Sequence, residues 1–289
     1  VATSGSIGVI IPPSIPMVVL GSITNISVGA LFLGGIVPGI LIGLSLMGIS
    51  AVICFKNGYG EATASGFSLQ TLATATKAAA LPLIAPLIVV GGILTGAFTP
   101  TESSVIAVVY TMFLGMIIYK KIKIADLPDV FLEAVVSSAN VVLIIAASSL
   151  FSWYLTKAGV PAAISQALFA VSTNPWFILL AINFIFFVGG MFLEGLALII
   201  MFVPILLPVA MKVGIDPVFF GVMVVINIAI GTLTPPVGVC LFVASSSGGV
   251  GYESVARRAT PFIMALVAVL ALTCLYPELI TFIPKHVIK

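Results

Sequence analysis

The stretch Gly231-Thr232-Leu233-Thr234-Pro235-Pro236 decides the fold, because it places a double proline inside a long apolar run. Two consecutive prolines remove two backbone donors and clash with the preceding turn, so a helix has to kink or unwind there. At membrane depth the freed carbonyls need a partner, and the nearby threonine hydroxyls make Na⁺ a natural one. We therefore predict a broken helix over residues 218–248. The alternative is a plain proline kink packed against its neighbours.

The same pattern occurs near the start of the chain, where Ser4-Gly5-Ser6-Ile7-Gly8 leads to Pro12-Pro13-Ser14. A shift of 223 residues places Ile7-Gly8 on Ile230-Gly231 and Pro12-Pro13 on Pro235-Pro236, and in the same register Pro38 falls on Pro261. The coincidence of a glycine and a double proline indicates an internal repeat. Residues 130–229 then lack counterparts, so we expect the chain to be the C-terminal two-thirds of a larger subunit.

Composition indicates that these breaks lie in a membrane. Of 289 residues, 61% are hydrophobic and 7% are charged, whereas a soluble domain carries about 25% charged residues. So few charges cannot cover a water-exposed surface, and lipid must be the main solvent. The net charge of +2 is too small to predict binding to nucleic acid. The three cysteines lie in apolar stretches without the spacing of a metal site.

Apolar runs of about 20 residues, enough to cross a bilayer, recur along the chain. The run 81–119 is too long for one crossing, so we predict two short spans that turn near Thr99–Glu102. Two apolar arms over 176–211 predict a helical hairpin with its tip at Met191–Gly195. The other predicted elements are spans at 37–55, 132–156 and 260–283 and a surface-lying amphipathic connector at 57–80. These elements group into the end of a first repeat (1–56), a connector with a linking span (57–98) and a second repeat (99–289).

Basic residues predict how these elements cross the membrane. The positive-inside rule puts the cluster Lys120–Lys123 in the cytoplasm, and Lys56 and Arg257-Arg258 fall on the same side. The broken helix at 1–27 then runs outward, whereas its partner at 218–248 runs inward. The predicted fold class is therefore an all-α polytopic membrane protein with an inverted repeat, a re-entrant helical hairpin and broken, unwound transmembrane helices.

Two carboxylates lie at the predicted turns. Glu194 sits at the hairpin tip, where a costly intramembrane charge favours a functional role; alternatively, it accepts hydrogen bonds from helix N-terminal amides. Glu102 follows Thr99-Pro100-Thr101, which is typical of a helix start with a threonine cap, so a structural helix break is favoured there. The sequence contains no nucleophile–base constellation, phosphate-binding glycine loop or His/Cys cluster. It therefore predicts neither an enzyme nor an organic cofactor.

At these residues the sequence resembles a known family. The segments Ser4–Ile15, Phe98–Glu102 and Gly190–Gly195 resemble signatures of the large membrane subunit of TRAP (tripartite ATP-independent periplasmic) transporters, and Ile230–Gly238 is similar to that family's second broken helix. The resemblance covers the whole chain. It implies the elevator type of fold of the ion-transporter superfamily, in the bacterial inner membrane. It also implies Na⁺-driven import of organic acids such as C4-dicarboxylates or sialic acid.

The resemblance further implies partners and site residues. A small four-helix membrane subunit and a periplasmic substrate-binding protein would complete the system in the lipid bilayer, with Na⁺ as the coupling ion. The predicted sodium-binding residues are Ser4, Gly5, Ser6, Gly8, Glu194, Gly195, Gly231, Thr232 and Thr234. The predicted substrate-binding residues are Pro12, Pro13, Ser14, Asn227, Pro235 and Pro236. The family's first hairpin tip is expected upstream of Val1. The sequence offers no clear intramembrane cation for a carboxylate, since Arg257 and Arg258 lie near a helix end.

Two other functions fit the same sequence. One is a stand-alone Na⁺/carboxylate symporter that works without a binding protein. The other is a membrane scaffold subunit without transport activity.

Labelling of single cysteines tests the predicted topology. A membrane-impermeant thiol reagent added from outside is expected to modify cysteines at positions 157 and 212, because Lys157 and Lys212 are predicted to be periplasmic. Cysteines at positions 121 and 257 should react only after the membrane is permeabilised. Modification of 121 or 257 from outside, with 212 protected, would contradict the inverted repeat.

Overall fold

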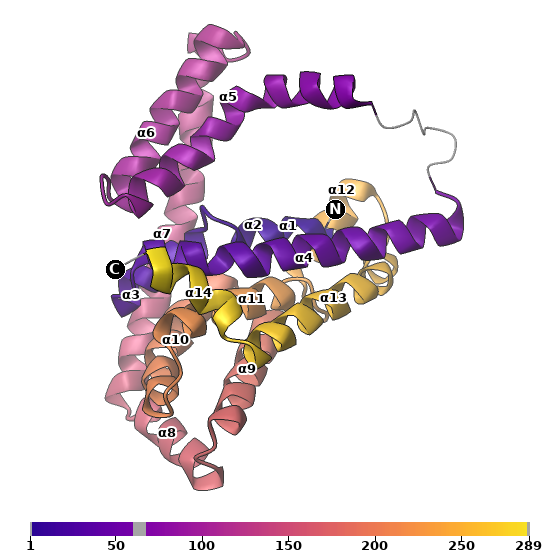
Figure 1. The fold of residues 1–289 in the computed structure, drawn as a ribbon. Helices are drawn as coiled ribbons and strands as arrows, with labels where there is room; N and C mark the ends of the chain where they lie inside the picture. Colours follow the sequence, from indigo (N-terminus) through magenta and orange to yellow (C-terminus); the bar gives the residue numbers. More distant parts are fainter. Residues whose placement is uncertain (1, 60–67, 288–289) are drawn as a thin grey trace. The chain divides into compact units, whose positions relative to one another are not determined.

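The computed structural model describes residues 2–59 and 68–287, and within these ranges every regular element is a helix. Figure 1 shows their course along the chain. The helices are α1 (Ala2–Gly5), α2 (Ile7–Ile10), α3 (Ile15–Thr24), α4 (Val28–Asn57), α5 (Leu69–Leu94), α6 (Pro100–Phe113), the π-turn η1 (Leu114–Ile118), the 3₁₀-turn η2 (Ile124–Asp126), α7 (Leu127–Lys157), α8 (Val160–Val171), α9 (Pro175–Phe192), α10 (Gly195–Lys212), α11 (Pro217–Gly231), α12 (Val239–Gly248), α13 (Tyr252–Leu275) and α14 (Glu278–Val287).

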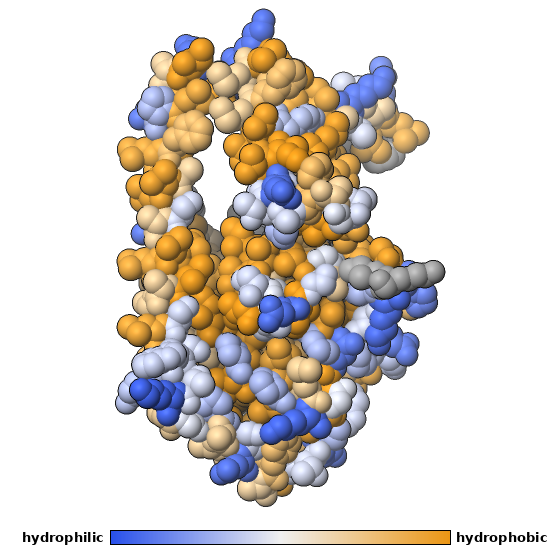
Figure 2. Space-filling model, turned by 90° about the vertical axis from the view of Figure 1, so that its left-hand side faces the viewer, coloured by the Kyte–Doolittle hydropathy of each residue, from blue (hydrophilic) through white to orange (hydrophobic). Residues whose placement is uncertain are grey.

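The predicted polytopic membrane character is confirmed. Within the described ranges, 8 helical segments are long and apolar enough to cross a bilayer. Large apolar side chains also cover much of the surface, for example Phe55 with 88% of its area exposed and Leu143 and Leu150 with 69% each. Hydrophobic residues dominate the face drawn in Figure 2. Such a surface is stable against lipid tails and would be costly in water.

The chain divides into two compact units, 1–49 with 143–289 and 50–142. Helices α4 and α7 each continue from one unit into the other. The repeat boundaries at residues 56 and 99 stay a prediction.

In the unit 50–142, α5 and α6 form an antiparallel pair that confirms the two helices predicted for 81–119. The Tyr110 hydroxyl donates to the Leu81 carbonyl at 2.9 Å and ties the two helices together. The first helix begins at Leu69, earlier than predicted, so the described part of the connector, from residue 69 on, continues directly into this span. Residues 60–67 of the connector lie outside the described residues.

The turn between α5 and α6 contains the predicted threonine cap. The Thr99 side chain accepts from the Glu102 amide at 3.3 Å, and Glu102 Oε2 accepts from the Thr99 amide at 2.8 Å. This reciprocal capping box satisfies two amide donors at the helix start. Glu102 is exposed and caps the N-terminal end of α6.

Helix α11 is the centre of the larger unit. All of its residues from Phe219 to Gly231 are buried, so this helix is apolar and covered on every side. It packs against the hairpin α9–α10, against α13 and α14, and against α2 and α3. In Figure 1 it lies among these helices. Edge-on packing of Phe220 against Phe186 of α9, with ring centroids 6.3 Å apart, fills the space between them.

Both predicted helix breaks are present. The first helix stops at Ile10 and resumes at Ile15, and the second stops at Gly231 and resumes at Val239. Each break is followed by a helix of 10 residues, α3 or α12. Each of these helices ends at a residue in the left-handed region, Asn25 with φ 59° or Gly249 with φ 61°. The long helices α4 and α13 follow, with an internal proline in each. The order of local elements therefore repeats, while the opposite orientation of the two copies stays a prediction.

The predicted last span at 260–283 is wrong in its bounds. Helix α13 begins at Tyr252 and ends at Leu275, and α14 begins a new helix at Glu278. Pro277 explains the end of α13, because proline disfavours the helical conformation of the residue before it. Arg257 and Arg258 consequently lie in the second turn of a helix rather than ahead of it. Helix α8 (Val160–Val171) was not predicted from the sequence.

Candidate functional site

The hairpin tip is built around Glu194. Leu193 and Glu194 join α9 to α10, and Glu194 Oε2 accepts from the amides of Leu196 at 2.8 Å and Ala197 at 3.1 Å. This is the N-terminal cap of α10, the structural alternative for this carboxylate, and it satisfies amides that a helix start leaves unpaired. The cap uses only Oε2. Glu194 is exposed at the tip, so its Oε1 is available to another ligand.

The tip lies against the end of α11 at a crossing of two glycines. A Cβ atom on Gly231 would lie 2.6 Å from the Gly190 Cα and 2.9 Å from its carbonyl oxygen, distances that no side chain can accept. Gly195 also faces α11, but here a Cβ would meet a side chain, at 2.5 Å from Ile228 Cγ2. The three glycines therefore allow the hairpin tip to reach the point where the second helix breaks.

The second break carries two hydroxyls and several free carbonyls. Thr232 Oγ1 donates to the Ala229 carbonyl at 2.9 Å, and Thr234 Oγ1 donates to the Ile230 carbonyl at 2.7 Å. A hydroxyl that donates its hydrogen keeps lone pairs to accept or coordinate. No hydrogen bond from residues 2–59 and 68–287 to the Leu233 carbonyl is found, and no side chain of these residues donates to the carbonyls of Thr234 and Pro235. The break thus gathers the hard oxygen atoms that a small cation requires.

Part of the loop after the break is anchored instead. The Tyr252 hydroxyl lies 3.1 Å from the Pro236 carbonyl and 3.0 Å from the Val237 carbonyl. The Thr232 carbonyl accepts from the Cys240 amide at 3.1 Å. These bonds hold the start of α12 and leave the oxygens nearest the double proline open.

The first break has a different environment. Ser6 Oγ donates to the Thr3 carbonyl at 2.7 Å, and Ser14 Oγ donates to the Val9 carbonyl. Nothing in the described chain lies within 4 Å of a Cβ on Gly5 or Gly8, and both glycines are exposed. The structure therefore brings the predicted sodium residues Glu194, Gly195 and Gly231 to the same place as Thr232 and Thr234. No hairpin tip from the described residues covers Ser4–Gly8.

The predicted substrate residues are spread over several environments. Pro12, Pro13, Pro235 and Pro236 form the two breaks, each with a cis bond between its prolines. Ser14 caps α3. Asn227 instead lies inside α11, with none of its surface exposed.

Asn227 forms a buried pair that the sequence did not reveal. Its Nδ2 donates to Asn183 Oδ1 of α9 at 2.7 Å and to the Met223 carbonyl at 3.0 Å. The Asn227 Oδ1 is buried without a hydrogen-bond partner among the described residues. Asn227 and Asn183 line an otherwise apolar cavity of about 400 Å³ between α9, α11 and α13. Asn183 could have been noticed as an amide in an apolar helix, but no sequence pattern pairs it with Asn227.

A buried helix that breaks beside a capped hairpin tip, in a chain of membrane-length helices, defines a class of protein. Transport proteins of the membrane use such breaks to expose carbonyls and helix ends to their ions and solutes. The chain matches over residues 1–279 the family described as the tripartite ATP-independent periplasmic transporter, DctM component, and it belongs to that family. As a member of this family it is a multi-pass protein of the bacterial inner membrane.

Curated relatives support the assignment. The chain is 38% identical to the sialic acid TRAP transporter large permease protein SiaM of Vibrio cholerae, over 98% of the chain and 66% of the relative. It is 36% identical to the C4-dicarboxylate TRAP transporter large permease protein DctM of Pseudomonas aeruginosa, over 99% and 66%. It is 40% identical to the isethionate TRAP transporter permease protein DctMQ of Oleidesulfovibrio alaskensis, over 98% and 44%. The chain therefore spans about two thirds or less of the length of these relatives.

Substitution of Gly231 tests the glycine crossing. Gly231→Ala is expected to abolish most transport. It should also lower the free energy of unfolding by roughly 1–3 kcal/mol and the melting temperature with it, because its methyl group meets the Gly190 backbone, which cannot rotate away. Gly189→Ala is the matched control, since its methyl group meets only the end of the Leu198 side chain. Uptake and detergent-solubilised melting curves measure both effects. Wild-type behaviour of Gly231→Ala would mean that the tip does not approach α11 this closely.

Proposed function

We propose that this chain is the substrate-translocating part of a Na⁺-coupled secondary importer of organic acids. The observation that carries the proposal is the group of oxygen atoms at the second break, which directly follows the contact between Gly231 of α11 and Gly190 of the hairpin. The hydroxyls of Thr232 and Thr234 and the open carbonyls beside them match the ligand preference of Na⁺. The C-terminal end of α11 adds partial negative charge at the same point.

The tip supplies the opposite side of the proposed ion site. Glu194 Oε1 lies free of the α10 cap, so this carboxylate contributes charge without losing its structural bonds. The Gly190–Gly231 crossing keeps the tip and the break at a fixed separation. Binding of Na⁺ between the hairpin tip and the break would join the hairpin to α11. The ion would then stabilise the conformation in which these two parts are in contact. We further propose that the hairpin α9–α10 and α11 move together across the membrane, in the elevator type of transport, and that the fold is an inverted repeat.

The names of the relatives suggest the class of substrate. Sialic acid, C4-dicarboxylates and isethionate, which appear in those names, are all organic anions. We propose that this chain carries an organic anion too, delivered by a periplasmic substrate-binding protein. A small four-helix membrane subunit is the proposed partner in the bilayer.

Reconstituted uptake tests this function against its two alternatives. We expect the complete transporter, in proteoliposomes, to accumulate a radiolabelled organic acid only with an inward Na⁺ gradient and only with its binding protein. Sialic acid, succinate and isethionate serve as the probes. Na⁺-driven uptake that needs no binding protein would indicate a stand-alone symporter. The absence of any uptake, from protein that remains monodisperse, would favour a scaffold.

Alanine variants test the ion site at the second break. Thr232→Ala or Thr234→Ala is expected to raise the Na⁺ concentration for half-maximal uptake about fivefold, the equivalent of about 1 kcal/mol for one lost oxygen ligand. Serine at the same position keeps the oxygen and should restore the wild-type value. Thr260→Ala is the control, because its hydroxyl makes the same kind of bond, to the Ala256 carbonyl, in an unbroken helix. An unchanged Na⁺ dependence in both alanine variants would remove these side chains from the site and return the break to a plain kink.

A further inference from the structure

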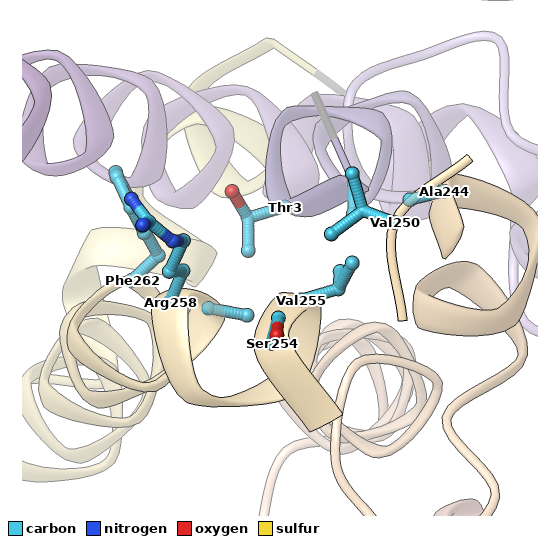
Figure 3. Close-up of a pocket in the computed structure, with 9 residues that line it drawn as sticks. Thr3, Ala244, Val250, Ser254, Val255, Arg258 and Phe262 are labelled. Atoms are coloured by element: carbon cyan, nitrogen blue, oxygen red, sulfur yellow. The ribbon is translucent and has the colours of Figure 1, made fainter. Parts of the chain in front are cut away.

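A second cavity lies in the larger unit, away from the hairpin tip. It is an open cleft with a volume of about 450 Å³, lined by α1, the end of α12 and the first turns of α13. Figure 3 shows Ser254 and Arg258 on α13, with Thr3 of α1 across from them. The remaining walls are small or apolar, including Val250, Val255 and Phe262. The size and the mixture of apolar walls with a few polar groups are typical of a small-molecule site.

Arg258 is the charged side chain among the residues that line this cavity. Arg258 forms no ion pair or hydrogen bond with any residue of 2–59 and 68–287. Thr3 lies across the cavity from Arg258, and 7% of its surface is exposed. A guanidinium that forms no ion pair gains from an oxyanion. The cavity therefore offers a cation to a ligand, beside the side chains of Thr3 and Ser254.

The internal repeat gives no structural reason for an arginine here. The 223-residue shift that aligns the two double prolines takes Gly35 and Gly39 to Arg258 and Phe262. In the first copy these glycines let α4 pack closely on the first break, where a Cβ on Gly35 would lie 2.5 Å from the Ile10 carbonyl. The second copy replaces the small residues with a cation and an aromatic ring, and both line the cavity. The two copies thus differ at the positions that would bind a solute.

The cavity is also connected to the first broken segment. Thr3 lines it and directly precedes Ser4–Gly8, the first predicted ion segment. The carbonyl of Thr3 accepts from Ser6 Oγ at 2.7 Å. A ligand beside Thr3 would therefore lie next to the same helical turn that is proposed to hold an ion.

We propose that this cavity is a carboxylate-binding subsite for the transported organic anion. Arg258 binds the carboxylate as its charge partner, beside the side chains of Thr3 and Ser254 that line the cavity. The link to the ion segment favours a transported solute over a lipid headgroup as the occupant. The proposal rests on the proposed function and adds to it the group that recognises the anion.

The neighbouring arginines provide a matched test. Arg257 and Arg258 are both exposed on the same helix, but only Arg258 lines the cavity. In the complete transporter, Arg258→Gln is expected to raise the KM of uptake for the transported acid at least about tenfold, the scale of one charge-assisted pair. Arg257→Gln should leave this KM within about twofold of the wild-type value, since it removes the same charge at a position outside the cavity. The KM of Arg258→Lys should lie between those of the wild type and Arg258→Gln, because lysine keeps the charge and loses the planar fork of donors.

Two further measurements identify the occupant. Binding of the same acid to purified transporter in nanodiscs of neutral phosphatidylcholine is expected to weaken in Arg258→Gln as much as uptake does. The Na⁺ concentration for half-maximal uptake, measured at saturating acid, should stay at the wild-type value, as should the melting temperature. An effect of Arg258→Gln that occurs only with anionic phosphatidylglycerol present would assign the cavity to a lipid phosphate and overturn the proposal.

The outcomes separate this proposal from the proposed function. Wild-type uptake driven by Na⁺, with Arg258→Gln and Arg257→Gln indistinguishable, would refute the subsite and leave the function standing. A wild-type transporter that neither binds nor accumulates any of the three probe acids would refute both.

Discussion

The close approach of Gly190 to Gly231 is the contact on which the rest of the larger unit depends. Two backbones meet there without side chains, so the tip of one helical hairpin reaches the break in another helix. Helix α11 can end in such a place because its preceding residues are buried on every side and hold it fixed. A methyl group at Gly231 would push the tip away and separate Glu194 from the oxygens of the break. Packing at one point thus determines the geometry of the candidate ion site.

The polar chemistry of the membrane interior is concentrated where helices stop. The hydroxyls of Thr232 and Thr234 satisfy carbonyls of the last turn of α11, and Tyr252 satisfies carbonyls after the double proline. Between them the oxygens nearest the prolines remain open. Unpaired polar groups inside a membrane are costly, so binding of the proposed cation would also stabilise the break. Arg258 differs, because it is exposed in its cleft and supplies donors where the break supplies acceptors.

The two copies of the repeat share their local elements and differ in their surroundings. Each has a double-proline break, a helix of 10 residues and a left-handed end. The second break meets a hairpin tip of the described chain, whereas Gly5 and Gly8 of the first are open. The positions of Gly35 and Arg258 correspond in the repeat, yet one closes a helix contact and the other lines a cavity. The two breaks therefore have similar local structure but different neighbours.

By itself the sequence determined the membrane setting, the two helix breaks, the hairpin and the family. Each depends on local chemistry, such as too few charges for water, prolines that cannot continue a helix, and motifs of adjacent residues. The sequence did not predict α8 or the correct bounds of α13, because apolar residues are found in both the helices and the connections of a membrane protein. Only the tertiary structure decided that Asn183 pairs with Asn227, that Gly190 meets Gly231, and that Arg258 lines a cavity with Thr3. These contacts join residues far apart in the chain, and a uniformly apolar sequence carries no periodic signal to show which helix faces meet.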